Sequence, residues 1–365
     1  MREILISGAS IAGQTLAYWL ARHGMRPTLV ERAPGPRMGG NGVDLRDQAI
    51  EVAERMGIMP RVRAAAADVQ GIKFVNASDR AVARMDMRSA GGEVEIMRGD
   101  LVALLSEAES GVEYVFGDSV RALAEDGDGV TVSFEQGATR RFDLVVGADG
   151  LHSTVRRLAF GPEQRFLRHK GHYFAFANAD SALGEDRWVS MFNLPGKMAG
   201  VYRSGNHAQA KAYFIFRSGL LAYDHRDVGE HKRLLKEVFA HETSWRVREL
   251  LDGALDDPDL YFDALSQVRM PSWSSGRVAL VGDAAYCASP ASGAGAELAI
   301  VGAYRLAGEL AGAADHRVAF RRYEEGLREL VRRKQRIGPN VRMMVPKNRL
   351  GMWTRNAVVS VLPRS

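Results

Sequence analysis

The stretch Ile4–Gly13 reads ILISGASIAG and leads directly into QTLAYWLARHG. An apolar run, a glycine-rich turn and a helix-like run in this order are typical of the start of a βαβ unit that binds a dinucleotide. Gly8 permits the tight turn, and Gly13 lets the helix pack close to the strand. Ser10 replaces the middle glycine of the usual GxGxxG pattern, but that position only has to let the backbone approach a pyrophosphate. Because serine is small, we expect the turn to hold phosphate groups.

A second strand-like run, RPTLVER at Arg26–Arg32, supplies the other half of this unit. It brings in Glu31, 18 residues after Gly13, near the spacing of about 20 at which an acid reaches the ribose of a dinucleotide. A glycine turn between a strand and a helix can also be purely structural. The apolar strand, the following helix and the acid together favour nucleotide binding.

The composition is that of an ordinary globular protein. The chain has 365 residues, 46% of them hydrophobic and 25% charged, which is enough for one large core or two domains. We expect a cytoplasmic protein without a membrane span, because there is no signal-peptide pattern and no run of about 18 apolar residues. The single Cys287 fits a reducing compartment. No metal site is expected, since HExxH and CxxC patterns are absent.

Charge gives no sign of a nucleic-acid partner. The net charge is +5, and the one basic cluster is RRKQR at Arg332–Arg336. It lies in a helix-like run that also carries Glu324, Glu325 and Glu329. A solvated helix face is the favoured interpretation over nucleic-acid binding. Anionic small molecules remain possible partners.

The middle of the chain has a different sequence pattern from its two ends. From about His172 to Arg217, short aromatic strands are broken by Gly, Pro and Asn, a pattern that predicts an antiparallel meander. Helical periodicity returns at His231–Glu242 and again through most of the chain after Ala285. The nucleotide-binding segments therefore enclose the meander, which makes the first domain discontinuous.

Two further motifs end apolar strands. DLVVGADGLHSTVRR at Asp143–Arg157 passes from a strand through Asp149-Gly150 into a capped helix. VALVGDAAYCASPASGAGAELAIVGAYRLAGEL begins at Val278, ends its strand at Gly282-Asp283 and leads through a glycine-rich loop into a long helix. The partly positive start of that helix would face a negative or electron-rich group.

The three motifs in this order, GASIAG with Glu31-Arg32, DGLHSTVR and GDAAYCASPASGAG, resemble the group A flavoprotein monooxygenases, the fold family of p-hydroxybenzoate hydroxylase. The resemblance covers nearly the whole chain. The segments at Gly39–Ile58 and Leu298–Leu310 and the tail MVPKNRLGMW look most similar to the tetracycline-modifying branch and its relatives in natural-product pathways.

The resemblance implies an α/β fold in which a Rossmann-like FAD-binding domain carries an inserted antiparallel β-sheet substrate domain and C-terminal helices. Residues 1–70, 98–165 and 266–340 would form the FAD-binding domain. Residues 71–97 and 166–265 would form the substrate domain, and residues 341–365 a helical tail. A monomer or a homodimer is expected.

The same resemblance implies an FAD-binding set. Its members are Gly8, Ser10, Ile11, Ala12, Gly13, Glu31, Arg32, Arg46, Arg98, Asp149, Gly150, Gly282, Asp283, Pro290, Gly293, Gly295 and Ala296. The opening turn and Arg98 would hold the pyrophosphate, and Glu31 the adenosine ribose, with Arg32 near the adenine. Asp149 would act on both FAD and NAD(P)H, and Asp283 would meet the ribityl chain. The isoalloxazine would be lined by Pro290, Gly293, Gly295 and Ala296.

Three positions depart from the family pattern. Tyr286 stands where many members have histidine, Glu297 where many have asparagine, and Gly302 where aspartate is common. These departures concern the surroundings of the flavin ring.

The implied reaction is hydroxylation of an aromatic or polyketide-like small molecule with O2, through a flavin hydroperoxide, in natural-product biosynthesis or antibiotic modification. NAD(P)H would visit as a transient co-substrate, since only one dinucleotide fingerprint is present. Flavin-dependent reduction of an isoprenoid or other double bond is an alternative, as is a non-enzymatic flavin sensor. Halogenation is disfavoured, because the WxWxIP segment is absent. No catalytic base stands out among His169, His172, His207 and His225.

Overall fold

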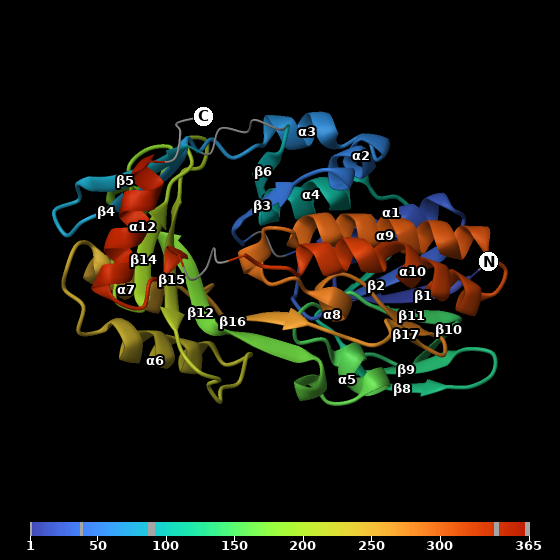
Figure 1. Cartoon of the computed structure of the whole chain (residues 1–365). Helices are drawn as coiled ribbons and strands as arrows, with labels where there is room; N and C mark the ends of the chain where they lie inside the picture. The colour runs from blue at the N-terminus through green and yellow to red at the C-terminus, as the bar shows by residue number, and fades with distance from the viewer. Residues whose placement is uncertain (1, 37–38, 87–91, 339–342, 362–365) are drawn as a thin grey trace. The chain divides into compact units, whose positions relative to one another are not determined.

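The computed structural model describes residues 2–36, 39–86, 92–338 and 343–361 (Figure 1). Two compact units are present, each built from three segments. The first comprises Met1–Ala66, Glu93–Arg168 and Ser266–Arg336, and the second Ala67–Gly92, His169–Leu265 and Ile337–Ser365. The expected domains also include residues 1, 37–38, 87–91, 339–342 and 362–365, which lie outside the described residues. Within the described ranges, no helix combines the length and the apolar character needed to cross a membrane.

The first unit is organised around a six-stranded sheet. Its strand order is β17-β18-β11-β1-β2-β7, with parallel pairing throughout except at the short edge strand β17. The strands are β1 (Glu3–Ser7), β2 (Arg26–Glu31), β7 (Glu113–Phe116), β11 (Leu144–Gly147), β17 (Ser274–Ser275) and β18 (Val278–Leu280). The central strands are apolar at consecutive positions because both faces of a parallel sheet are covered. This arrangement confirms the predicted α/β fold.

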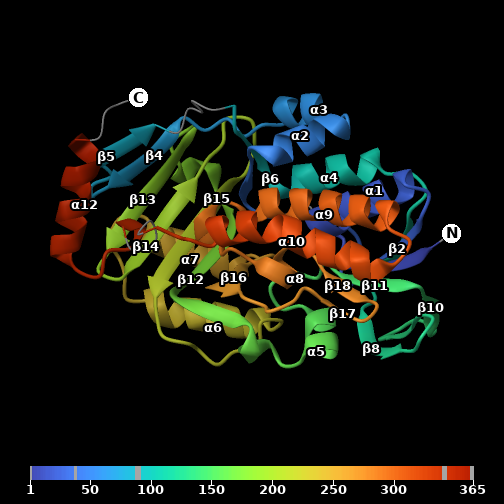
Figure 2. The ribbon, with the colours of Figure 1, turned by 45° about the vertical axis from the view of Figure 1, so that its right-hand side comes forward.

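Helices and two smaller sheets complete the first unit. The helices are α1 (Ile11–Arg22), α2 (Gln48–Arg55), α3 (Met59–Ala64), α4 (Arg98–Ala108), α5 (Thr154–Phe160), α8 (Asp283–Tyr286), α9 (Gly295–Gly312) and α10 (His316–Lys334). Figure 2 shows α9 and α10 running side by side, as Figure 1 does. One smaller sheet pairs β3 (Gly42–Leu45) with β6 (Val94–Met97). In the other, β9 (Val130–Phe134) lies between β8 (Val120–Glu125) and β10 (Arg140–Phe142). The domain bounds implied by the resemblance put the β6 residues in the substrate domain, whereas β6 pairs with β3 and belongs to the first unit.

The second unit is built on a seven-stranded sheet in the order β16-β12-β15-β14-β13-β4-β5. Its strands are β4 (Gly71–Val75), β5 (Ala81–Asp86), β12 (Leu167–Ala179), β13 (Trp188–Leu194), β14 (Lys197–Tyr202), β15 (Ala210–Arg217) and β16 (Tyr261–Val268). The expected antiparallel meander is present in β13, β14 and β15. However, β12 pairs with β15 and not with β13, its successor in the sequence.

The helices α6 (Val228–Phe239), α7 (Val247–Asp256) and α12 (Arg349–Val361) belong to the same unit. The inward-facing rings of Phe214 and Phe216 contact Phe239 of α6, and the apolar side chains of α7 extend the same core. Asp227 caps α6 by accepting a hydrogen bond from the backbone N–H of Glu230, which satisfies one of the free amides at the helix start.

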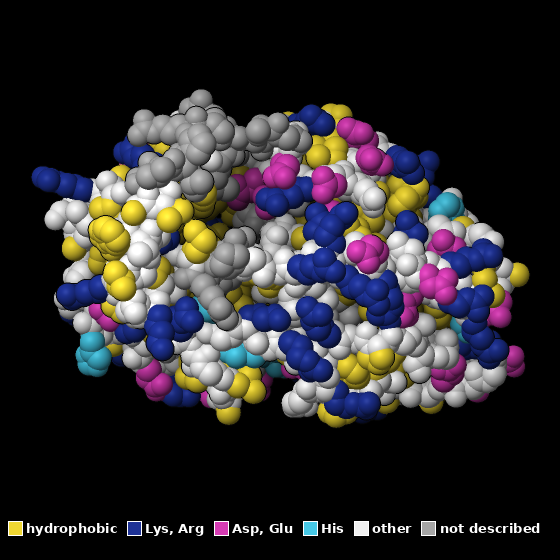
Figure 3. All heavy atoms as spheres, viewed as in Figure 1, with side chains coloured by type: hydrophobic (Ala, Val, Ile, Leu, Met, Phe, Trp, Pro, Cys, Tyr) yellow, Lys and Arg dark blue, Asp and Glu magenta, His cyan; other side chains and the backbone are white. Residues whose placement is uncertain are grey.

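The basic cluster near Arg332 forms part of an exposed helix surface. Arg332 and Arg333 are exposed on α10, and further exposed arginines precede them on the same helix. Lys and Arg side chains gather over this part of the surface in Figure 3. Lys334, the next residue, is instead mostly buried and forms ion pairs.

Candidate functional site

The opening turn joins β1 to α1 at the carboxyl end of the sheet. Gly8 adopts a φ of +108°, and a Cβ at this position would lie 2.5 Å from the carbonyl oxygen of Ala148. A Cβ at Gly13 would lie 1.9 Å from the carbonyl oxygen of Gly8. No side chain fits in either place, so both glycines are required by close packing between the turn, α1 and the end of β11.

The first turn of α1 offers amide groups to an anion. Ser10 is the N-cap residue in an extended conformation, and its hydroxyl does not cap the helix. No acidic side chain lies in the first turn. The first hydrogen bond into the helix runs from the N–H of Gln14 to the carbonyl of Ser10, so the amides of residues 11–13 precede it. These amides carry the positive end of the helix dipole.

Arg98 adds a full positive charge to this turn. It opens α4, and its Nη1 donates a hydrogen bond to Oγ of Ser10 at 2.9 Å. The side chain runs close beside Gly40, where a Cβ would lie 2.7 Å from Nε of Arg98. The contact between Ser10 and Arg98 was not predicted, because the two residues are far apart in the sequence. Nothing in the residues alone indicates which side chain meets the serine.

Glu31 lies at the end of β2, beside the same turn. Its Oε2 accepts a hydrogen bond from the N–H of Ala9 and its Oε1 one from the N–H of Ala33, both at 2.9 Å. The carboxylate is therefore held between the ends of β1 and β2. Arg32, the following residue, is exposed.

The second motif forms the start of α5. Asp149 accepts hydrogen bonds from Oγ of Ser153 and from the N–H of Val155, at 3.0 Å for the latter. Burial raises the pKa of Asp149, while the hydrogen bond from Ser153 acts in the opposite direction. Gly150 has a φ of +81°, which favours glycine at this bend. The close approach of Gly8 to the backbone of Asp149 brings the first and second motifs together.

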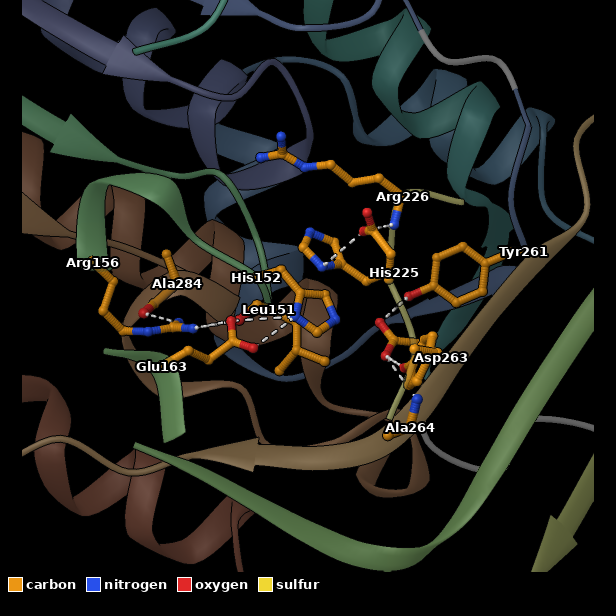
Figure 4. A network of polar contacts seen from close by, with 12 residues as sticks. Leu151, His152, Arg156, Glu163, His225, Arg226, Tyr261, Asp263, Ala264 and Ala284 are labelled. Atoms are coloured by element: carbon orange, nitrogen blue, oxygen red, sulfur yellow. Dashed lines mark hydrogen bonds and ion pairs between the residues drawn. The ribbon is translucent and has the colours of Figure 1, made fainter. Parts of the chain in front are cut away.

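A buried arginine ties the second motif to the third. Arg156 is fully buried, and Figure 4 shows its guanidinium among its partners. Nη1 donates to the carbonyl oxygen of Ala284 at 2.9 Å, and Nη2 to that of Leu151 at 2.6 Å. Nη2 also lies 3.1 Å from Oε2 of Glu163, whose carboxylate pairs with His152. The sequence placed Arg156 on a helix without indicating that it links two motifs.

The third motif approaches the first. Gly282 has a φ of +66°, and a Cβ there would lie 2.9 Å from Cβ of Ala12. Asp283 begins α8 and is exposed beside this contact. The loops after β1, β11 and β18 thus meet at one edge of the sheet, as expected for the carboxyl ends of neighbouring parallel strands.

The loop before α9 lies beside β3. Gly293 is left-handed, with a φ of +63°, and a Cβ there would lie 3.3 Å from Oδ2 of Asp44. Asp44 accepts a hydrogen bond from Nη2 of Arg46 at 2.8 Å, and Nε of Arg46 lies 3.1 Å from Oε2 of Glu93. The other predicted loop residues take three different positions: exposed Pro290, Gly295 at the start of α9, and buried Ala296.

The four histidines considered as a base do not form one cluster. Nε2 of His169 pairs with the carbonyl oxygen of Ser218, and Nδ1 of His172 with that of Lys170, both at 3.0 Å. His207 is a surface residue beside Asn206, and His225 lies beside Asp224. None of these partners indicates a proton acceptor for a substrate, so the catalytic base stays unassigned.

The residues at the sheet edge fit FAD. The glycines leave the backbone bare, and the first turn of α1 has uncapped amides and no acidic side chain. Arg98 adds a cation beside this turn. A pyrophosphate requires these features. Glu31 supplies an acceptor at the neighbouring strand end.

Comparison with known proteins agrees with this geometry. The family described as FAD binding domain matches residues 1–319. A flavin-dependent monooxygenase from an unidentified prokaryote is 40% identical over 341 residues, covering 92% of this chain and 88% of the relative. The crystal structure of tetracycline destructase Tet(51) has a TM-score of 0.88 at 35% identity, covering 99% of this chain and 96% of that one. Tetracycline destructase Tet(55) has a TM-score of 0.85 at 38% identity, covering 98% and 95%.

Proposed function

Because this chain belongs to the FAD binding domain family and is a flavin-dependent monooxygenase, we propose that it hydroxylates a planar aromatic or polyketide-like small molecule. Three motifs at one sheet edge would hold the cofactor, and the sheet of the second unit would supply a surface for the substrate. The chemistry that FAD supplies when bound is hydride acceptance from NAD(P)H and activation of O2. The polypeptide binds, orients and shields the reactants.

Each group at the sheet edge has a part in this proposal. Arg98 and the amides at the start of α1 hold the pyrophosphate, and Glu31 holds the adenosine ribose. Asp283, exposed at the start of α8, meets the ribityl chain. The loop at residues 290–296 and the start of α9 would hold the isoalloxazine, and the uncapped amides there would favour negative charge on the reduced ring.

The observation that carries the substrate proposal is a row of aromatic rings on the second unit's sheet. Tyr261 stacks on Phe176, with ring centres 4.7 Å apart and planes at 14°. Phe176 neighbours Tyr213 at 6.2 Å, and Tyr213 neighbours Tyr202 at the same distance. Phe174 lies 5.4 Å from Tyr261. Five rings from four strands thus form a continuous aromatic row.

This row lies on the sheet face opposite the α6 core. Side chains alternate along a strand, so Phe174 and Phe176 point away from the face on which Phe214 contacts Phe239 of α6. Tyr261 is 40% exposed at one end of the row. Aromatic faces suit a flat, conjugated ligand, because stacking buries a large area with little loss of side-chain freedom.

A substrate screen tests the proposal. NAD(P)H consumption by the FAD-loaded protein is followed with tetracycline and with simple phenols, and hydrogen peroxide is measured alongside. A substrate increases NAD(P)H consumption, lowers the fraction released as peroxide and yields a product that contains one added oxygen atom. If no planar compound stimulates consumption above the background, or if turnover persists under argon, the proposal is wrong.

The aromatic row is tested separately by substitution. Phe176→Ala should raise the KM for such a substrate about 2- to 12-fold, because it removes a stacking surface worth about 0.5–1.5 kcal/mol. The dissociation constant of FAD should stay within about twofold of the parent value. Leu220→Ala, at a strongly exposed leucine outside the row, serves as the control. An unchanged KM in Phe176→Ala would place the substrate elsewhere.

Reduction of an isoprenoid or other double bond is not favoured, because relatives that match over most of the chain are named flavin-dependent monooxygenases. The argon experiment still distinguishes the two reactions, since reduction does not consume O2.

A further inference from the structure

A carboxylate is buried at the head of α9, where positive helix potential is expected. Glu297 lies in the first turn of this helix and is 0% exposed. The N-cap residue, Ala294, has no side chain that could cap the helix. An uncapped helix start carries about half a positive charge. An ionised Glu297 would therefore cancel much of the potential that this helix offers to a neighbouring ligand.

The positive charge of Lys334 offsets the negative charge of this carboxylate. Its Nζ lies 2.6 Å from Oε2 of Glu297 and 3.2 Å from Oδ2 of Asp47, the N-cap residue of α2. Oε1 of Glu297 is buried and has no hydrogen-bond partner among the described residues. One lysine at the end of α10 thus bridges the starts of α9 and α2. The partners come from three elements that are distant in the sequence.

The pKa of Glu297 is raised overall, because the effect of burial exceeds that of the neighbouring cation. Burial raises the pKa of its carboxyl group, and the neighbouring ammonium of Lys334 lowers it. Asp47 adds a smaller raising effect and Arg333 a smaller lowering effect. These groups come from α10 and from the start of α2. The carboxylate is thus held in a poorly solvated place by a single close cation.

We propose that Glu297 and Lys334 are a positioning pair that sets the electrostatic potential at the head of α9, and through it the redox potential of the flavin. This inference rests on the proposed function, which places the isoalloxazine beside residues 290–296. Reduction adds negative charge to the flavin, so the local potential favours or opposes it. Lys334 restores the positive potential that Glu297 removes. Neither residue needs to touch the cofactor, since both act through the helix start.

A double-mutant cycle on the FAD-loaded protein tests the pair. The variants are Glu297→Gln, Lys334→Met and the two combined, and the flavin midpoint potential is measured by equilibration with a reference dye. Glu297→Gln should shift the potential positive, because it removes a negative charge. Lys334→Met should shift it negative at alkaline pH, and the shift should fade as the pH falls and the carboxyl group binds a proton. The double variant should return towards the parent value.

Two controls separate this effect from general changes in charge. Glu329→Gln and Arg332→Met remove like charges from exposed positions on α10, and both should leave the potential unchanged. Affinity for FAD, measured by titration of apoprotein, should stay within about tenfold in every variant, because the pyrophosphate and ribose contacts are intact.

The inference is overturned if Glu297→Gln shifts the potential no more than Glu329→Gln does. Lys334→Met leaves an unpaired buried carboxylate, so it can fail to fold. In that case, Glu297→Gln and the double variant, in which no such carboxylate remains, decide the question. Failure of the parent protein to bind FAD would contradict the proposed function instead, so the two failures are distinguishable.

Discussion

The hydroxyl oxygen of Tyr286 occupies the place where a side chain at residue 302 would begin. A Cβ at Gly302 would lie 1.9 Å from that oxygen. Tyr286 is buried, and its hydroxyl accepts a hydrogen bond from the hydroxyl of Tyr323 at 3.0 Å. Two of the three departures from the family pattern, at 286 and 302, are therefore in contact. A large residue at the first position requires the absence of a side chain at the second.

Gly302→Ala should destabilise the protein by about 1–3 kcal/mol, the usual cost of an extra methyl group in a packed core. Thermal unfolding of the apoprotein measures the change. The control is Gly308→Ala in the same helix, where a Cβ meets nothing within 4 Å and removal of glycine should stabilise by about 0.5–1 kcal/mol. Tyr286→Phe should rescue part of the loss at 302. Equal behaviour of the two alanine variants would contradict the contact.

Arg98→Ala should weaken FAD binding about 5- to 150-fold. The arginine supplies a charge-assisted contact to the pyrophosphate, worth about 1–3 kcal/mol. Fluorescence titration of apoprotein with FAD measures the dissociation constant. Arg121→Ala, at an exposed arginine on β8 of the same unit, should leave it unchanged. Stoichiometric, tight FAD in Arg98→Ala would remove this residue from the proposed set.

Ser10 should tolerate glycine better than valine. Ser10→Gly removes only the hydrogen bond to Arg98, worth about 0.5–1.5 kcal/mol, so affinity for FAD should fall less than about tenfold. Ser10→Val adds branched bulk where the pyrophosphate approaches and should weaken FAD far more. The same titration compares the two variants. If Ser10→Val binds FAD as tightly as the parent, this turn is not the phosphate site.

Glu109, the C-cap residue of α4, makes the free energy of unfolding depend on pH. Burial raises the pKa of its carboxyl group from 4.5 to about 8, while a hydrogen bond from the Tyr114 hydroxyl opposes the rise. Between these values, the folded protein keeps a proton that the unfolded chain has lost. The stabilisation present below pH 4.5 is therefore lost as the pH rises through about 8.

Glu109→Gln removes this titration. In denaturant unfolding, the variant should gain stability over the parent at about pH 9 relative to about pH 5, because only the parent must ionise a buried group. Glu135→Gln, an exposed surface change, should show the same difference from the parent at both values. A pH-independent effect of Glu109→Gln would mean that the carboxyl group titrates normally in the folded state.

The sequence determined the local parts of this protein. Each βα turn requires small residues at fixed spacings, because only a bare backbone packs as Gly8 and Gly13 do. Consecutive apolar residues such as those of β1 predict strands of a covered parallel sheet. The order of the three motifs then carried the resemblance to flavoprotein monooxygenases. Such signals are short-range, so they can be read from a single chain.

The tertiary structure alone decided which distant residues meet. The contacts of Arg98 with Ser10, of Arg156 with Ala284 and of Lys334 with Glu297 join segments that no periodicity or spacing relates. The pairing of β12 with β15 also depended on how the whole sheet closes. Long-range contacts form only when packing of the complete core selects one arrangement among many with similar local patterns. For this reason, Tyr286 and Gly302 were recognisable in the sequence as two separate departures, and only their contact in the folded chain made them one.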